Sequence, residues 1–122
     1  MQLPARIIDG CAPDSGTHFR EKPYGLGGIR EFLRDVIALA NADFDGPRYI
    51  IVGIAVDKDR HRIFRPVDSG DFGGRPDYVS LAHDHIEPAV DIRYDRAYIN
   101  GQSVGCFAIT GCREQPYMMR ID

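Results

Sequence analysis

The fold is decided by the stretch from Ile29 to Ile54, which is IREFLRDVIALANADFDGPRYIIVGI. Its first half places apolar residues at i, i+3, i+4, i+7 and i+8, which is the stripe of an amphipathic helix. Gly46 and Pro47 disfavour helix, so a turn follows. The run that starts at Tyr49 is too short and too rich in β-branched residues for a second helix, and it predicts a strand buried on both faces. The helical stripe comprises Ile29, Phe32, Leu33, Val36 and Ile37.

Segments on the N-terminal side of this stretch are irregular. Residues 1–17 are interrupted by proline and glycine, so we expect a lead-in with one short strand near residues 6–8. A second short strand is expected at residues 18–22. Asn41 ends the main helix, and we expect it to cap that helix in the left-handed region.

On the C-terminal side, a returning strand is expected at residues 61–67, followed by a glycine-rich loop at 68–75. A second helix is expected from Pro76 to the residues before Pro88. Alternation over 90–99 and 102–110 about Asn100-Gly101 predicts a hairpin with a type I′ turn. A last strand is expected at residues 117–121.

Together these elements predict one α+β domain over residues 1–122, with a mixed, largely antiparallel sheet and two main helices packed on it. No apolar run is long enough to span a bilayer, and no signal peptide is evident, so no membrane association is expected. Three cysteines without C-x-x-C spacing predict neither a disulfide framework nor a zinc site, which fits a cytoplasmic protein. We expect Cys106 to be a small core residue.

The order of several short motifs resembles the AlbA-type DNA-binding domain of bacterial Schlafen-like proteins. The resemblance covers residues 14 to 119 or so and implies an α+β fold, often within a longer regulatory protein. The matching segments are His18-Phe19-Arg20, Ala38-Leu39-Ala40-Asn41, Asp45-Gly46, Val52-Gly53-Ile54, Ile86-Glu87-Pro88 and Pro116-Tyr117.

Some members of this family cleave RNA with three acidic residues, and such carboxylates would hold Mg²⁺ or Mn²⁺. This chain departs from that pattern, because His18 stands where the resemblance implies a glutamate and Ala55 stands where an acidic pair begins. Replacement by other carboxylates requires a shift in register, so we expect no intact nuclease site and no cofactor. The candidate catalytic residues of that alternative are Asp14, Glu21, Asp57 and Asp59.

The remaining role that the resemblance implies is binding to DNA or RNA. The net charge of −3 weighs against it, but the cationic residues are mostly arginine, which suits contact with phosphate. Tyr24, Phe64 and Phe72 could stack on bases, although aromatic residues more often fill cores. The candidate phosphate contacts are Arg20, Lys22, Arg60, Arg62 and Arg65.

Three other interpretations stay open or are disfavoured by spacing. A protein-interaction module suits the acidic balance, and a homo-oligomer could form through the edge of the strand at 117–121. ATP binding lacks support, because Gly25, Gly27 and Gly28 do not make a phosphate-binding fingerprint. His83 and His85 would point to different faces of a helix, so no metal site is expected there.

Overall fold

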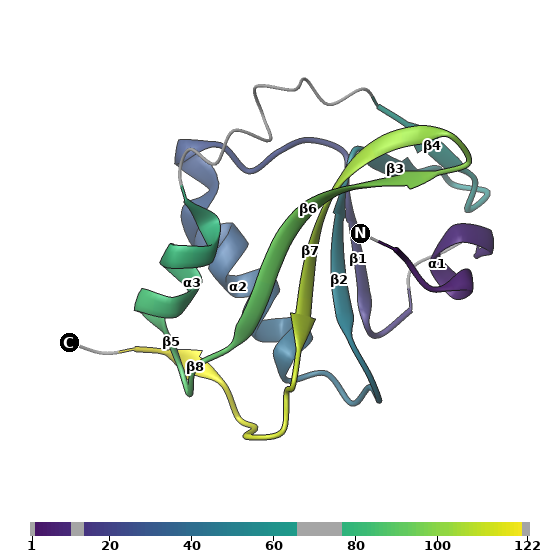
Figure 1. Cartoon of the computed structure of the whole chain (residues 1–122). Helices are drawn as coiled ribbons and strands as arrows, with labels where there is room; N and C mark the ends of the chain where they lie inside the picture. The colour runs from purple at the N-terminus through teal and green to yellow at the C-terminus, as the bar shows by residue number, and fades with distance from the viewer. Residues whose placement is uncertain (1, 11–13, 66–76, 121–122) are drawn as a thin grey trace.

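The computed structural model describes residues 2–10, 14–65 and 77–120, and within them it shows an α+β fold. The main sheet has four strands in the order β1-β2-β7-β6 (Figure 1). β1 is parallel to β2, whereas the β2–β7 and β7–β6 pairs are antiparallel. The predicted mixed, largely antiparallel sheet is therefore confirmed. The four strands are β1 (Thr17–Arg20), β2 (Arg48–Val52), β6 (Asp91–Ile99) and β7 (Gln102–Thr110).

One face of this sheet is covered by α2 (Ile29–Ala40) and α3 (Tyr78–His85). A short 3-10 helix, η1 (Leu26–Gly28), leads into α2. The apolar stripe of α2 faces the sheet as predicted, and the Phe32 ring centroid lies 5.0 Å from that of Phe107 on β7. Asp77 caps α3, since its carboxylate accepts hydrogen bonds from both the backbone N–H and the hydroxyl of Ser80.

The other face is covered by shorter elements: α1 (Ala5–Asp9), β3 (Ile54–Val56) and β4 (Arg62–Phe64). Their side chains pack with the sheet, and all five residues of β2 are buried because both of its faces are covered. The strand predicted at residues 6–8 is wrong, since these residues belong to α1. Pro4 suits the start of a helix, and one helical turn buries Ile7 beneath the sheet beside Leu3.

Gly53 divides the strand predicted over residues 49–54 into two. Its φ of 111° is open to glycine but strained for other residues, and it turns the chain out of the main sheet. β3 therefore pairs with β4 as a separate two-stranded sheet. We expected one sheet that includes the returning strand at 61–67. This is wrong, because the turn at Gly53 places that strand in the separate sheet. The type I′ turn is supported by the positive φ angles of Asn100 and Gly101.

The C-terminal segment returns to the end of α2. β8 (Met118–Met119) pairs with β5 (Ile86–Glu87), so one edge of the predicted last strand is occupied within the chain. Asn41 has φ −92° and ψ −4°, so the expected left-handed cap is wrong. Its side chain instead bonds the backbone of Tyr117 twice, with Nδ2 donating to the carbonyl at 2.9 Å and Oδ1 accepting from the N–H at 2.6 Å.

Several sequence expectations fall partly or wholly outside the described residues, including the last two residues of the strand expected at 61–67. The loop at 68–75, with Phe72, and the start of the second helix at Pro76 lie there, as does the end of the strand expected at 117–121. None of the helices in the described part of the chain is long and apolar enough to cross a membrane.

Candidate nucleic-acid interface

The end of β1 and the end of β4 lie side by side, because both bond to Gly53. The Gly53 N–H donates to the carbonyl of Arg20 at 2.7 Å, and the Arg65 N–H donates to the carbonyl of Gly53 at 2.8 Å. Three of the predicted cations, Arg20, Lys22 and Arg65, are thereby brought to one end of the molecule. The β3–β4 hairpin, which carries Arg60 and Arg62, extends from the same end (Figure 1).

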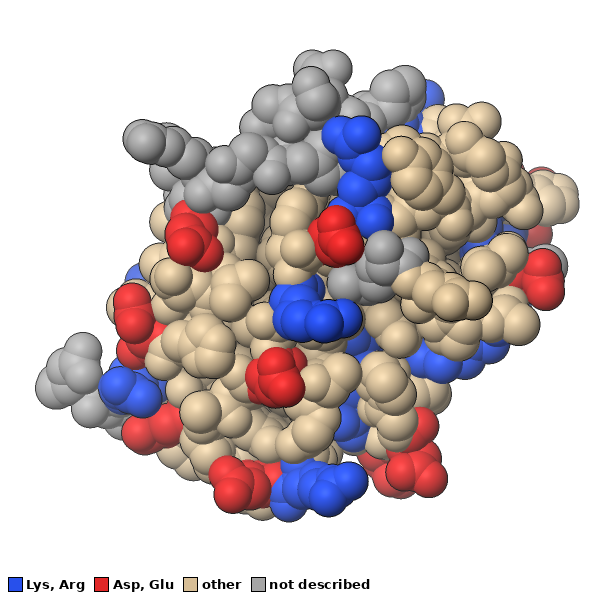
Figure 2. Space-filling model, viewed as in Figure 1, with Lys and Arg blue, Asp and Glu red and all other residues tan. Residues whose placement is uncertain are grey.

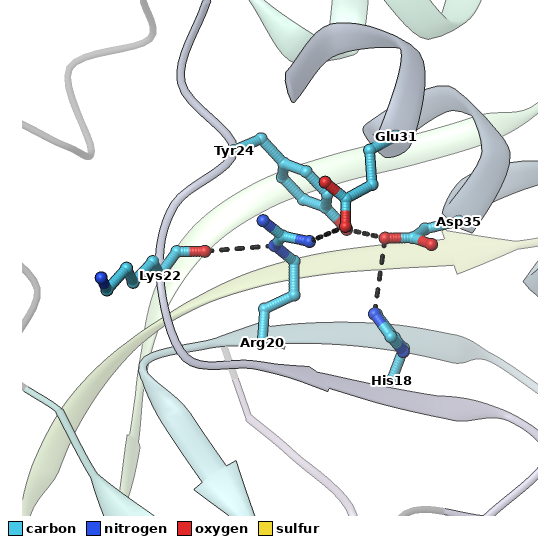
Figure 3. A network of polar contacts seen from close by, with 6 residues as sticks. All are labelled: His18, Arg20, Lys22, Tyr24, Glu31 and Asp35. Carbon is cyan, nitrogen blue, oxygen red and sulfur yellow. Dashed lines mark hydrogen bonds and ion pairs between the residues drawn. The ribbon is translucent and has the colours of Figure 1, made fainter. Parts of the chain in front are cut away.

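Arg20 is held by contacts within the protein (Figure 3). Its Nη1 lies 2.6 Å from Oε1 of Glu31 on α2, and its Nε donates to the carbonyl of Lys22 at 3.1 Å. The guanidinium carbon lies 3.9 Å from the centroid of the Tyr24 ring, and the side chain is only 18% exposed. Arg20 therefore joins β1 to α2, and its Nε and Nη1 groups already have partners within the protein.

A second polar pair lies one turn further along α2. Asp35 Oδ2 accepts a hydrogen bond of 2.6 Å from the Tyr24 hydroxyl and lies 3.4 Å from Nε2 of His18 (Figure 3). Burial acts to raise the pKa of Asp35, but the bonds from His18 and Tyr24 and the charge of Arg20 outweigh it, so the pKa is lowered. Burial, together with Asp35, raises the pKa of Tyr24. Asp35 is thus an ionised acceptor and Tyr24 a protonated donor near neutral pH.

Sequence analysis did not predict the Arg20–Glu31 and His18–Asp35 pairs, although residue spacing indicates which side chains share a face. His18 and Arg20 are two residues apart on a strand and share a face, and Glu31 and Asp35 are four apart on a helix and share a face. The pairing of the two elements could not be known from either pattern alone. His18 is 43% exposed and lines a shallow hollow of about 440 Å³ together with residues 19–22 and Glu31.

The arginines of the hairpin differ in exposure, and therefore in whether a ligand can contact them. Arg62 is half-buried, since its guanidinium carbon lies 5.0 Å from the centroid of the Phe19 ring and its Nη1 donates to the carbonyl of Ile8. It therefore fastens α1 to the hairpin. Arg65 is 52% exposed and its Nε lies 3.0 Å from Oε1 of Glu21. Arg60 is exposed at the tip of the hairpin.

Of the carboxylates that could replace a nuclease site, only Asp57 and Asp59 are brought together, and Asp14 and Glu21 lie apart from each other. Asp14 precedes β1 and bonds to Arg6, whereas Glu21 follows β1 and bonds to Arg65. The four residues of β1 that separate them span about 13 Å. Burial acts to raise the pKa of Asp14, but hydrogen bonds from neighbouring residues lower it overall.

Asp57 lies elsewhere again, in the turn of the hairpin. Its Oδ1 accepts the backbone N–H groups of Asp59 and His61 at 2.9 and 2.8 Å, so the carboxylate orders the turn. Within the described ranges, Asp57, Asp59 and His61 form the one group of three ligand-type side chains whose ligand atoms lie within 4.8 Å of one another, and all three are exposed. These would be the residues to hold a divalent cation, although the turn already uses one of their oxygens.

The aromatic and thiol candidates are mostly structural. Tyr24 is buried in the core beneath α2, and Phe64 packs against the cluster on the other face of the sheet. Cys106 is fully buried, and burial raises its pKa to about 12, which confirms that it is a core residue. Figure 2 shows acidic and cationic side chains interspersed over the face in view rather than segregated.

The sequence matches no family model, and comparisons with characterised proteins and with solved structures likewise find no similar protein.

Proposed function

We propose that this chain is a nucleic-acid-binding domain of the Schlafen-like AlbA type, and that it binds phosphates with one surface, here called the cationic end. The cationic end comprises Lys22 after β1, Arg65 after β4 and Arg60 at the hairpin tip, all of them exposed. The observation that carries the proposal is the pair of Gly53 hydrogen bonds, which holds the ends of β1 and β4 together. Arg20 and Arg62 position this surface and do not contact the ligand.

The backbone at Arg60 gives independent support. Arg60 has φ 66°, a conformation that glycine or asparagine adopts at lower cost than a long side chain. The hairpin would therefore be at least as stable with glycine at this position. A cation held in that conformation at an exposed tip is consistent with a role for its side chain in binding.

The acidic neighbours set the expected strength of binding. Glu21 occupies one donor of Arg65, so a phosphate must displace that carboxylate. Because binding then rests on few phosphate contacts, we expect modest affinity that falls with salt less steeply than in proteins with many such contacts.

The test is fluorescence anisotropy with short single-stranded RNA, single-stranded DNA and duplex DNA at about 50 and about 200 mM salt. The triple variant Lys22→Ala, Arg60→Asn, Arg65→Ala should lose most of the binding at low salt. Asn at position 60 keeps the turn conformation while it removes the charge. The triple variant Arg30→Ala, Arg34→Ala, Arg93→Ala removes three exposed cations from α2 and β6 and is the matched control.

A second variant tests whether binding depends on the cationic end or only on the net charge of the protein. Glu21→Gln frees Arg65, so it should strengthen binding, whereas a nonspecific charge effect would give the same gain for Asp91→Asn on β6. Absence of binding to all three probes at low salt would contradict the proposal and favour a protein-interaction module.

A further inference from the structure

Arg48, the first residue of β2, is a buried arginine that pairs with no carboxylate in the described part of the chain. The residue is only 5% exposed. Its Nη2 donates to the carbonyls of Phe44 at 2.6 Å and Ala42 at 3.3 Å, while its Nε is buried with no hydrogen-bond partner. None of the ion pairs within residues 2–10, 14–65 and 77–120 includes Arg48. A buried guanidinium is costly unless an anion lies beside it.

A hollow of about 290 Å³ adjoins this side chain. It is lined by residues 44–48 and 110–113, so it lies where β2 begins and β7 ends. Both loops are at the lower end of the sheet in Figure 1, away from the β3–β4 hairpin. We call it the Arg48 hollow. The lining includes a second arginine, Arg113, as well as Thr110, and Asp45 is its one acidic residue.

Cys112 lines the same hollow but does not supply the missing negative charge. Burial raises the pKa of its thiol, and the charge of the nearby Arg48 opposes that rise only in part. The thiol is therefore neutral near neutral pH. The residues that line the Arg48 hollow thus include two arginines and a single exposed aspartate.

We propose that the Arg48 hollow binds a phosphate-type oxyanion through the guanidinium groups of Arg48 and Arg113. The unprotonated oxygens of a phosphate are acceptors, which match the guanidinium donors of Arg113 and those of Arg48 that the Phe44 and Ala42 carbonyls leave free, and the phosphate supplies a counter-charge for the buried Arg48. The phosphate belongs either to a small phosphorylated molecule or to the terminus of a nucleic acid. This site is separate from the cationic end, because the two lie at opposite ends of β2, and it does not depend on the proposed function.

The first experiment titrates the full chain with inorganic phosphate, at ionic strength matched with chloride, and follows backbone amide signals by NMR. The largest shifts should fall within residues 44–48 and 110–113, including Gly46 and Gly111. Arg113→Ala should weaken binding about fivefold or more, because it removes one of two charged partners. Asp45→Asn should strengthen binding, since it removes the opposing carboxylate.

The matched control is Arg30→Ala on α2, which removes an exposed arginine far from the Arg48 hollow and should leave phosphate affinity unchanged. Arg48→Gln tests the buried charge directly. This variant also loses the hydrogen bonds to the carbonyls of Ala42 and Phe44 that stabilise the turn before β2. Arg113→Ala keeps the proposal testable if the Arg48 variant does not fold.

Alkylation of Cys112 gives a second readout. Bound phosphate should slow the reaction of Cys112 with iodoacetamide, measured on the peptide that contains Cys112 so that Cys11 does not contribute, while Cys106 stays unreactive because it is fully buried. Oligonucleotides with a 5′-phosphate or a 5′-hydroxyl then distinguish the sources. Stronger shifts at the hollow with the 5′-phosphate assign a nucleic-acid end, and shifts with free phosphate alone assign a small molecule. Equal loss in Arg113→Ala and Arg30→Ala, or shifts centred outside the hollow with every probe, would overturn the proposal.

Discussion

The two faces of the main sheet are covered in different ways. On one face, α2 is a twelve-residue helix whose own apolar stripe supplies much of the core with α3. On the other face, α1 has five residues and the β3–β4 hairpin pairs only three residues in each strand. The shorter elements are held by distant polar contacts, such as that from Arg62 to the carbonyl of Ile8. Helix-covered and hairpin-covered faces should therefore differ in how cooperatively they unfold.

The largest effect is expected on the helix-covered face. Phe32→Ala removes a fully buried ring that packs against Phe107 and Tyr78, and it should lower the free energy of unfolding by about 3–5 kcal/mol. Urea denaturation followed by circular dichroism measures it. Because the lost contacts belong to the centre of the core, all probes should report the same transition.

A smaller effect is expected on the hairpin-covered face. Ile7→Ala removes a buried side chain from α1 and should cost about 2–4 kcal/mol at most. The loss should appear as local opening of α1, with faster amide exchange at residues 7, 8 and 10 than in β2. If exchange rises equally in α1 and β2, the two faces unfold together and the distinction between them disappears.

The sequence predicted the first face well and the second poorly, for a physical reason. The stripe from Ile29 to Ile37 has a 3.6-residue period, and it specifies a buried helical face without knowledge of its partner. The segment around Ile7 is too short to show a period, and its helix depends on a sheet built from distant residues. The break at Gly53 was likewise hidden inside an apolar run.

The candidate site, like the fold, was predictable only where a local feature of the sequence specifies it. The cationic residues Lys22, Arg60 and Arg65 could be singled out by type, and their gathering at one end depends on β1–β2 pairing. Which arginines are already engaged could not be predicted, because Glu31 is eleven residues from Arg20 and Glu21 is forty-four from Arg65. Arg48 gave no signal at all, since burial of a charge is a tertiary property.

A third prediction concerns the link between α2 and the C-terminal segment, on the helix-covered face. Asn41→Ala removes two hydrogen bonds to Tyr117 and leaves a backbone N–H and carbonyl without their partner, so it should cost about 1–3 kcal/mol. Asn41→Asp keeps the acceptor but replaces the donor with a carboxylate oxygen that faces the Tyr117 carbonyl, so it should also destabilise the protein. Chemical denaturation of both variants measures these costs, and an unchanged free energy of unfolding in Asn41→Ala would contradict a stabilising role for the two bonds.

A fourth prediction concerns how the stability of the helix-covered face depends on pH. The folded-state pKa of Asp35 lies below the ordinary 3.8 because its bonds to His18 and Tyr24 outweigh burial. Its stabilising contribution is therefore complete above about pH 4 and is lost as pH falls through the folded-state pKa. Asp35→Asn should lose about 1 kcal/mol at neutral pH and show a shallower decline in acid. Parallel denaturation curves for variant and parent below about pH 4 would contradict this assignment.

The smallest effect is expected at the tip of the hairpin. Arg60→Gly relieves the positive φ of 66° and should raise the stability of the protein by about 0.5 kcal/mol, while Arg60→Ala should not. Thermal unfolding of the two variants checks it. An equal response of both variants would show that charge rather than backbone conformation determines stability at this position.

The two hydrogen bonds between Asn41 and Tyr117 also have a kinetic consequence. They join residues 76 positions apart, and because closure of so long a loop is entropically costly, we expect them to form late in folding. Interactions made after the transition state slow unfolding without changing the rate of folding. The Asn41 side chain is therefore a determinant of the lifetime of the native state: its loss would let the protein open more often while it refolds as fast as before.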